Sequence, residues 1–161
     1  MTRALLHTLR EDSRLPGAHR FRTARHGSPQ QILPPAAEIR RAAALRAALR
    51  RFLRRSELSA RAAGLTPRQH LLLLMIAGSL DLSGKASVSE LSERLQLAQS
   101  TVTELVDRAV GCGLVRREHS PRDARVSLIR LTEEGEERLA RVFSSLAQER
   151  AELLQAIENS R

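Results

Sequence analysis

The sequence predicts a mainly α-helical fold with a small β-hairpin (α+β), and two patterns in its second half carry that prediction. Between residues 99 and 110 the apolar positions recur at the spacing of a helix that is buried along one stripe. These positions are Val102, Leu105, Val106, Ala109 and Val110. Farther on, two strand-like segments, 114–118 and 126–131, flank the turn residues Ser120-Pro121-Arg122-Asp123, which predicts a hairpin.

Long helical patterns precede this region. The first 35 residues contain repeated proline and glycine, so 1–35 is expected to be a basic, disordered N-terminal extension. A helix rich in Ala, Arg and Leu follows over 36–64 and ends at Gly64. The lobe over 65–132 begins with Thr66-Pro67-Arg68-Gln69, a capping box for a helix that is apolar almost all round and therefore buried.

Two further helix starts follow in the chain. After a loop over 78–85, a second capping box, Ser87-Val88-Ser89-Glu90, starts a short helix before the 99–110 helix. Thr132 caps a last helix over 133–161 that runs unbroken to about Asn159, and its acidic first turn complements the helix dipole. Apolar residues line one side of it at Leu139, Val142, Phe143, Leu146, Leu153, Leu154 and Ile157.

The two long helices carry more apolar surface than the lobe between them can cover. A second copy of the chain is the simplest partner for the helices over 36–64 and 133–161, so we expect a homodimer.

The net charge of +9 is concentrated in the first half of the chain. Residues 1–65 contain 14 arginines against 4 acidic residues, whereas residues 133–161 contain 4 arginines against 7 acidic residues. This asymmetry indicates either a polyanionic partner or packing of the basic first helix on the acidic last one. For 1–35, the alternative to a disordered tail is a basic arm on DNA phosphates through Arg20, Arg22 and Arg25.

The chain resembles the MarR family of bacterial transcription regulators in five segments that occur in the family's order. These are L-T-P-R-Q-H-L-L-L-L at 65–74, S-T-V-T-E-L-V-D-R at 100–108, G-L-V at 113–115, S-P-R-D-A-R at 120–125 and L-T-E-E-G at 131–135. The resemblance implies a winged helix-turn-helix with long N- and C-terminal dimerisation helices. It also implies a DNA-binding dimer, usually a repressor, that is often released by a small ligand or an oxidant.

The helix over 99–110 carries short polar side chains on its outer face, of the kind that contact base edges in a DNA major groove. We expect DNA contacts from Gln99, Ser100, Thr101, Thr103 and Arg108. By resemblance, Arg125 enters the minor groove or grips phosphate, Asp123 orients its guanidinium, and Arg122 at the hairpin tip is a further contact. The alternatives are capping and solvation for the hydroxyl residues, and a surface ion pair for the hairpin residues.

Two positions depart from the family pattern. Glu104 stands where a basic residue is common, and we expect it to pair with Arg108 one turn later, with acceptance from a cytosine amino group as the alternative. Ala98 occupies the cap position of the helix but has no side-chain oxygen. Both departures leave the base specificity open.

The sequence does not indicate other chemistry. Cys112, between two glycines, is interpreted as a small packing residue, with a redox switch as the alternative. The five histidines lack metal-ligand spacing, and His70 is expected to pack against Leu65. No nucleophile elbow, phosphate loop or paired nucleophile and base occurs, so we expect no enzyme, no cofactor and no metal.

Composition bounds the compartment. There is no run of about 18 apolar residues and no secretory signal, so neither a membrane span nor export is expected. A single cysteine suits the reducing cytoplasm of a bacterium.

The predicted function is therefore sequence-specific binding of double-stranded DNA by a homodimeric repressor that a small ligand relieves. Two-fold pairing would place two DNA-contacting helices one turn of DNA apart, on a pseudo-palindromic site. By resemblance, that ligand lies in a cleft between the dimer helices and the DNA-binding lobe, lined by aliphatic residues with Phe52, Phe143 and His70. Two rivals remain open. One is a winged-helix protein-interaction module in which Glu104 and Asp107 weaken DNA binding, and the other is a sequence-blind DNA-binding protein that uses the basic first half.

Overall fold

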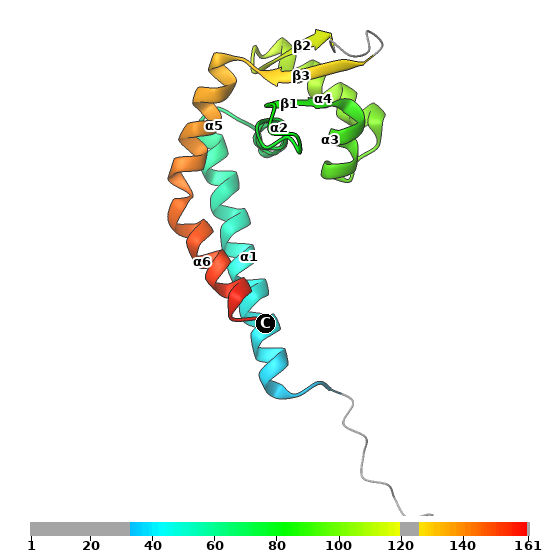
Figure 1. Cartoon of the computed structure of the whole chain (residues 1–161). Helices are drawn as coiled ribbons and strands as arrows, with labels where there is room; N and C mark the ends of the chain where they lie inside the picture. Colours follow the sequence, from blue (N-terminus) through cyan, green and yellow to red (C-terminus); the bar gives the residue numbers. More distant parts are fainter. Residues whose placement is uncertain (1–32, 120–125, 161) are drawn as a thin grey trace, which may run out of the picture. The chain divides into compact units, whose positions relative to one another are not determined.

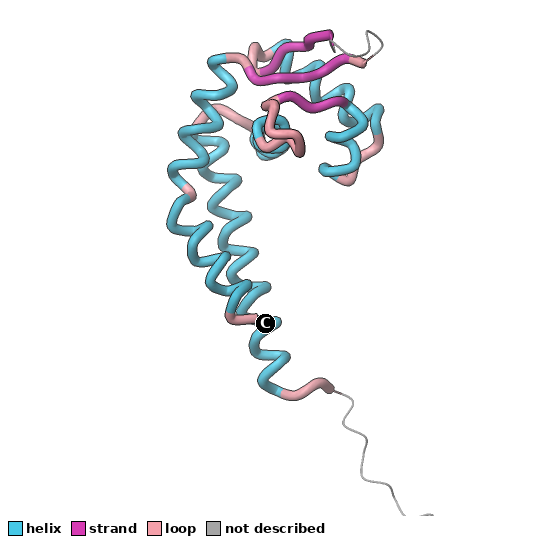
Figure 2. Tube along the Cα trace, in the orientation of Figure 1, coloured by secondary structure: helices cyan, strands magenta, loops and turns pink. Residues whose placement is uncertain are grey.

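Helices make up most of the described chain, with a small antiparallel sheet at one end, as the sequence predicts. The computed structural model describes residues 33–119 and 126–160. Residues 1–32, which are most of the predicted N-terminal extension over 1–35, lie outside these ranges. The predicted turn Ser120-Pro121-Arg122-Asp123 lies outside them as well. Figure 1 shows the order of the elements, and Figure 2 separates helices, strands and loops by colour.

Helix α1 (Ala36–Ala62) lies beside the C-terminal helix α6 (Ala147–Glu158), as Figure 1 shows. Pro35 stands at the N-cap, and Gly64 adopts a φ of +72° just after the helix, a conformation that glycine reaches without strain. Arg55 Nε donates to Glu149 Oε1 at 2.9 Å, so the basic first helix does pack on the acidic last one.

Helix α2 (Pro67–Ala77) forms the centre of the core. The predicted capping box is present: the Gln69 amide donates to Thr66 Oγ1 at 3.2 Å, and the Thr66 amide donates to Gln69 Oε1 at 2.9 Å. Leu72, Leu73 and Ile76 are fully buried in a hydrophobic cluster that also includes Ala60 of α1. Most of the later helices and two of the strands pack on α2, so it supports the rest of the described fold.

The sheet has three strands in the order β1-β3-β2, one more than the predicted hairpin. Strands β2 (Val115–His119) and β3 (Ser127–Leu131) form the hairpin, and β1 (Lys85–Ser87) adds to the other edge of β3. Residues 85–87 were expected at the end of a loop and the start of a helix. A strand of three residues is too short for periodicity to reveal, and its pairing with β3 is decided by tertiary contact.

Helix α3 (Val88–Leu95) begins with only half of the predicted capping box. Ser87 Oγ accepts from the Glu90 amide at 3.2 Å, but the Glu90 carboxylate does not return the bond. That carboxylate accepts instead from Arg94 at 3.3 Å and from the Leu80 amide at 3.4 Å. The prediction was wrong in this half because Arg94, one turn along the same helix, competes for the carboxylate with a full charge.

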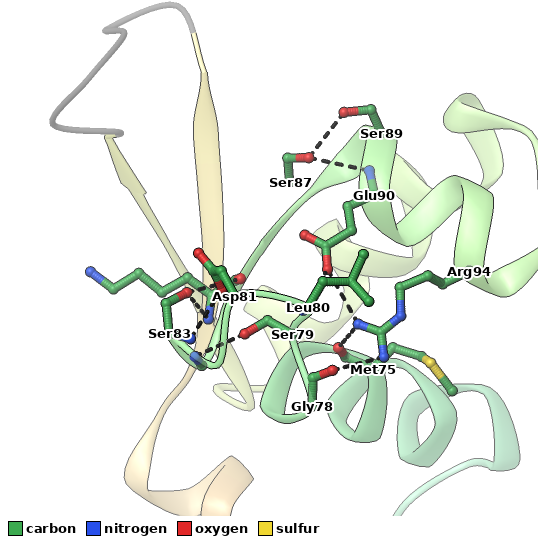
Figure 3. A network of polar contacts seen from close by, with 12 residues as sticks. Met75, Gly78, Ser79, Leu80, Asp81, Ser83, Ser87, Ser89, Glu90 and Arg94 are labelled. Atoms are coloured by element: carbon green, nitrogen blue, oxygen red, sulfur yellow. Dashed lines mark hydrogen bonds and ion pairs between the residues drawn. The ribbon is translucent and has the colours of Figure 1, made fainter.

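Arg94 ties α3 to the end of α2 (Figure 3). Its guanidinium donates to the carbonyl oxygens of Met75 at 2.7 Å and Gly78 at 2.8 Å. The last turn of a helix leaves carbonyls without intrahelical partners, and α2 has no basic residue of its own there. A neighbouring helix therefore supplies the cation that caps α2.

The predicted last helix is two helices, α5 (Glu133–Ser145) and α6, which meet at Leu146. An unbroken helix would give the Val142 and Phe143 carbonyls to the amides four residues on. Here Ser145 Oγ donates to the Val142 carbonyl at 2.9 Å and Arg150 Nη1 donates to the Phe143 carbonyl, so the ladder breaks. Leu146 is 3% exposed at this break and joins the core.

Among the described residues, no helix has the length and apolar character that crossing a membrane requires.

Candidate nucleic-acid interface

Helix α4 (Gln99–Gly111) is the second helix of the helix-turn-helix, and its buried stripe is nearly the predicted one. Val102, Val106 and Ala109 are fully buried, and Leu105 is almost so. Val110, expected in the stripe, is 40% exposed because it lies at the margin of the contact. The turn from α3 passes through Gln96, whose positive φ of 55° lets the chain reverse within a few residues.

The outer face of α4 carries the polar residues predicted to contact DNA. Gln99 and Ser100 are exposed, whereas Thr101 and Thr103 are half-buried at the edges of the face. Thr103 Oγ1 donates to the Gln99 carbonyl at 2.8 Å, so its hydroxyl proton is used and its oxygen remains an acceptor. Ala98 is the N-cap and gives no side-chain bond, which leaves the first amides of α4 without a side-chain acceptor.

Arg108 does not pair with Glu104. Among the ion pairs of the described residues, none joins these two side chains, and both are exposed. Arg108 instead lines a shallow groove with Thr66, Pro67, Arg68 and Gln69 at the start of α2, and with Leu105 on its own helix. The predicted pair is worth only a few tenths of a kcal/mol at an exposed helix position, too little to hold two long side chains together.

An ion pair that sequence reasoning missed joins α4 to the hairpin. Arg117 Nη2 on β2 donates to Asp107 Oδ1 on α4 at 2.7 Å. Spacing along the chain gives no signal for such a pair, because the contact depends on how β2 packs against α4. Opposite charges on a helix and on the strand after it were the available hint.

A second charge cluster lies on the other face of the sheet. Glu118 contacts Lys85 at 2.8 Å, Arg116 at 3.1 Å and Arg130 at 3.5 Å, so one carboxylate joins all three strands. The hydrogen bond from Lys85, followed by that from Arg116, lowers the pKa of Glu118 below its ordinary value. The hairpin thus presents arginine side chains on both of its faces. The predicted contacts Arg122, Asp123 and Arg125 lie outside the described residues.

Cys112 is exposed, so the expectation of a small packing residue was wrong. It is the C-cap of α4, and its Sγ accepts from Gln69 Nε2 at 3.6 Å. The glycines on both sides carry no side chain that could cover it, and this explains the exposure.

An apolar cavity of about 500 Å³ lies where α2, β3 and α5 meet. Phe143 lines it, together with Leu74, Ala77, Gly78, Gly84, Leu131, Glu136, Leu139 and Ala140. Phe52 and His70 do not line it, because Phe52 packs against the core and His70 is buried beside Ser56, with Nδ1 and Oγ 3.4 Å apart. Burial lowers the pKa of the His70 imidazole below its ordinary value, because the charged form is disfavoured away from water.

Comparison with known proteins agrees with this geometry. Residues 63–126 match the model of the MarR family. The chain is 36% identical over 81 residues to the HTH-type transcriptional repressor MdtR of Bacillus subtilis (strain 168), across 50% of each chain. It is 34% identical over 96 residues to the uncharacterized HTH-type transcriptional regulator YhbI of the same organism, across 60% of each chain. The chain thus spans about half to three-fifths of the curated relatives it matches.

The fold is also that of solved structures. A crystal structure of a mutant MarR from E. coli complexed with operator DNA superposes with a TM-score of 0.55 over 71% of this chain and 80% of that one. Its sequence identity to this chain is 22%, so the similarity concerns the fold.

Proposed function

We propose that the protein is a sequence-specific regulator of transcription that binds double-stranded DNA, because residues 63–126 match the model of the MarR family. One observation carries the proposal: α4 is buried along one stripe and presents short polar side chains on the opposite face. A helix of this kind fits the major groove, where such side chains contact base edges. MdtR is named a repressor, which favours repression as the sign of regulation.

The proposed DNA-binding lobe is 65–132. In α4, the contacts would come from Gln99, Ser100, Thr101, Thr103 and Arg108. The exposed first turn of α4 adds backbone amides that suit a phosphate oxygen. By family resemblance, Arg122, Asp123 and Arg125 would extend the contact from the hairpin tip to the neighbouring groove.

We infer a homodimer from apolar side chains left exposed on the long helices over 36–64 and 133–161. The most exposed are Leu154 at 61%, Leu53 at 52%, Phe143 at 49%, Leu58 at 48%, Ile39 at 41% and Ile157 at 38%. A second copy would cover these side chains on both partners at once. The two-fold symmetry of such a dimer fits a pseudo-palindromic operator. We place this binding in the cytoplasm of a bacterium.

A small apolar effector is the proposed means of relief. The cavity of about 500 Å³ is large enough for such a molecule, and its wall is aliphatic apart from Phe143 and Glu136. It lies between α5, on the dimerisation side, and α2, which supports α4. A molecule bound there would change the spacing of the two α4 helices, provided that it binds one spacing better than the other.

Footprinting tests the proposed mode of binding. The wild-type chain first selects duplexes from a random pool, and hydroxyl radicals then cleave the enriched duplex with and without protein. We expect two protected segments related by two-fold symmetry and centred about one helical turn, roughly 10 base pairs, apart or a multiple of it. One asymmetric segment would contradict the dimer, and protection without an enriched sequence would contradict specific binding.

A further inference from the structure

The ion pair between Asp107 and Arg117 joins the two elements that the proposed function brings to DNA. Asp107 lies on α4 and Arg117 on β2, and the Nη2–Oδ1 distance is 2.7 Å. The side chains remain accessible, with 60% of Asp107 and 37% of Arg117 exposed. Both groups can therefore meet a ligand without rearrangement of the core.

Asp107 poses an electrostatic problem on this surface. It follows Ser100 by two helical turns and Thr103 by one, so it lies on the polar side of α4. A free carboxylate there would repel DNA phosphates. An exposed ion pair stabilises a fold by about 1 kcal/mol at most, so stability alone is a weak reason for this carboxylate.

The strand register shows what the carboxylate holds. Arg117 lies opposite Ile129, which is buried, so Arg117 is on the face of β2 that packs toward α4. Its neighbour Arg116 lies opposite Arg130 on the other face and pairs with Glu118 at 3.1 Å. Of the two strand arginines, Arg117 alone can be oriented from α4.

Arg117 keeps most of its hydrogen-bonding capacity. Toward the described residues it donates through Nη2 to Asp107, whereas a guanidinium has five N–H donors in a planar fork. The remaining donors suit a phosphate, which arginine binds through two parallel bonds. When α4 lies in a major groove and the hairpin reaches beside it, their junction crosses the phosphate backbone between the two.

We propose that Asp107 is a positioning residue, which holds the Arg117 guanidinium at the junction of α4 and β2 for contact with a DNA backbone phosphate. The inference rests on the proposed function, since it needs α4 in the major groove. It assigns opposite roles to two acids on one helix. Asp107 assists binding through Arg117, whereas Glu104, unpaired among the described residues, opposes it.

The sign of a charge-removing substitution tests the proposal. Asp107→Asn should weaken binding to the selected duplex roughly fivefold, the scale of ordering one long side chain on binding. Glu104→Gln removes the same charge from the same helix one turn earlier and should leave the affinity unchanged or raise it. A general repulsion of phosphates by α4 acids predicts tighter binding for both variants.

A double-mutant cycle with a salt titration completes the experiment. Arg117→Gln should weaken binding and reduce the slope of log Kd against log salt by about one, as loss of one phosphate contact does. Adding Asp107→Asn to that variant should cause no further loss, because Asp107 acts through Arg117. Asp107→Glu, which keeps the carboxylate, should recover part of the affinity.

Circular dichroism and sedimentation check that each variant keeps its fold and its oligomeric state. An Asp107→Asn protein that binds as tightly as wild type, or an Arg117→Gln protein with an unchanged salt slope, would overturn the proposal. The slope criterion stands by itself if Asp107→Asn fails to fold. A wild type that binds selected and scrambled duplexes equally would contradict the proposed function, and the inference would fall with it.

Discussion

At the residue scale, Gly135 sets how closely the first turn of α5 approaches the hairpin. A Cβ at this position would lie 2.1 Å from the Leu114 carbonyl oxygen, far inside van der Waals contact. The Thr132 amide donates to the same oxygen at 3.1 Å, which fixes the backbone that the Cβ would strike. The glycine is required here by close approach of two backbones, because its φ is an ordinary helical one.

We predict that Gly135→Ala lowers the free energy of unfolding by about 2 kcal/mol or more, since backbone must shift to admit the methyl group. Gly111→Ala is the matched control, because Gly111 is also helical and its Cβ would meet no atom within 4 Å. That substitution should be neutral or stabilise by up to about 1 kcal/mol. Urea unfolding of both variants measures the difference, and similar losses in the two would refute the account.

The residues on the outer face of α4 could be predicted from the sequence, but the ion pairs that its charged residues form could not. The positions of Ser100, Thr101 and Thr103 follow from helical periodicity, which needs no knowledge of packing. Glu104 and Arg108 had the right spacing for an ion pair and do not form one. Asp107 and Arg117 form one across ten residues because β2 packs beside α4, and that packing is a property of the tertiary fold.

At the element scale, Arg94 couples the helix-turn-helix to the central helix (Figure 3). We predict that Arg94→Ala lowers the free energy of unfolding by roughly 2 kcal/mol, because two charge-assisted bonds to the end of α2 are lost. Arg108→Ala, which removes an exposed arginine with no hydrogen bond to the described residues, should change it by less than about 0.5 kcal/mol. Equal effects in urea unfolding would show that the Arg94 bonds contribute little.

Elements that begin with a local sequence signal could be predicted. Elements that depend on contacts with distant residues, or on side chains that bond to helix carbonyls, could not. Thr66 and Gln69 lie within four residues of each other and predict the start of α2, and the structure has their capping box as expected. Strand β1 exists only because β3, some forty residues later, pairs with it. The break at Leu146 depends on Ser145 and Arg150 taking carbonyls from the helix ladder, which a smooth apolar pattern conceals.

At the scale of the whole molecule, the exposed apolar side chains of α1 and α6 predict self-association. Leu53→Glu with Leu154→Glu should weaken the dimer by about a hundredfold or more, since two-fold symmetry places each buried charge in the interface twice. Leu80→Glu is the control, because Leu80 is 79% exposed in the loop after α2. Sedimentation equilibrium gives the dissociation constants, and a wild type that stays monomeric at high concentration would contradict the dimer.

The fold class and the order of the elements followed from the sequence because the apolar positions of the helices recur at helical spacing. What the long helices pack against was open to two interpretations, since excess arginine in the first half suits either DNA or an acidic helix. The Arg55–Glu149 pair assigns one arginine of α1 to the second interpretation. Its other arginines are exposed, so charge toward DNA from this half is still a prediction.

The most direct test of sequence-specific binding compares the affinities of the wild type for a selected duplex and for a scrambled duplex of the same composition, at two salt concentrations. We predict a preference of roughly a thousandfold or more. Arg125→Ala, by the family resemblance, should remove much of it, whereas Arg116→Ala on the strand should remove less. Equal binding to both duplexes, indifferent to Arg125, would contradict the account and indicate a sequence-blind DNA-binding protein. Absence of binding to either duplex at low salt would also contradict the account, and would indicate a protein-interaction module.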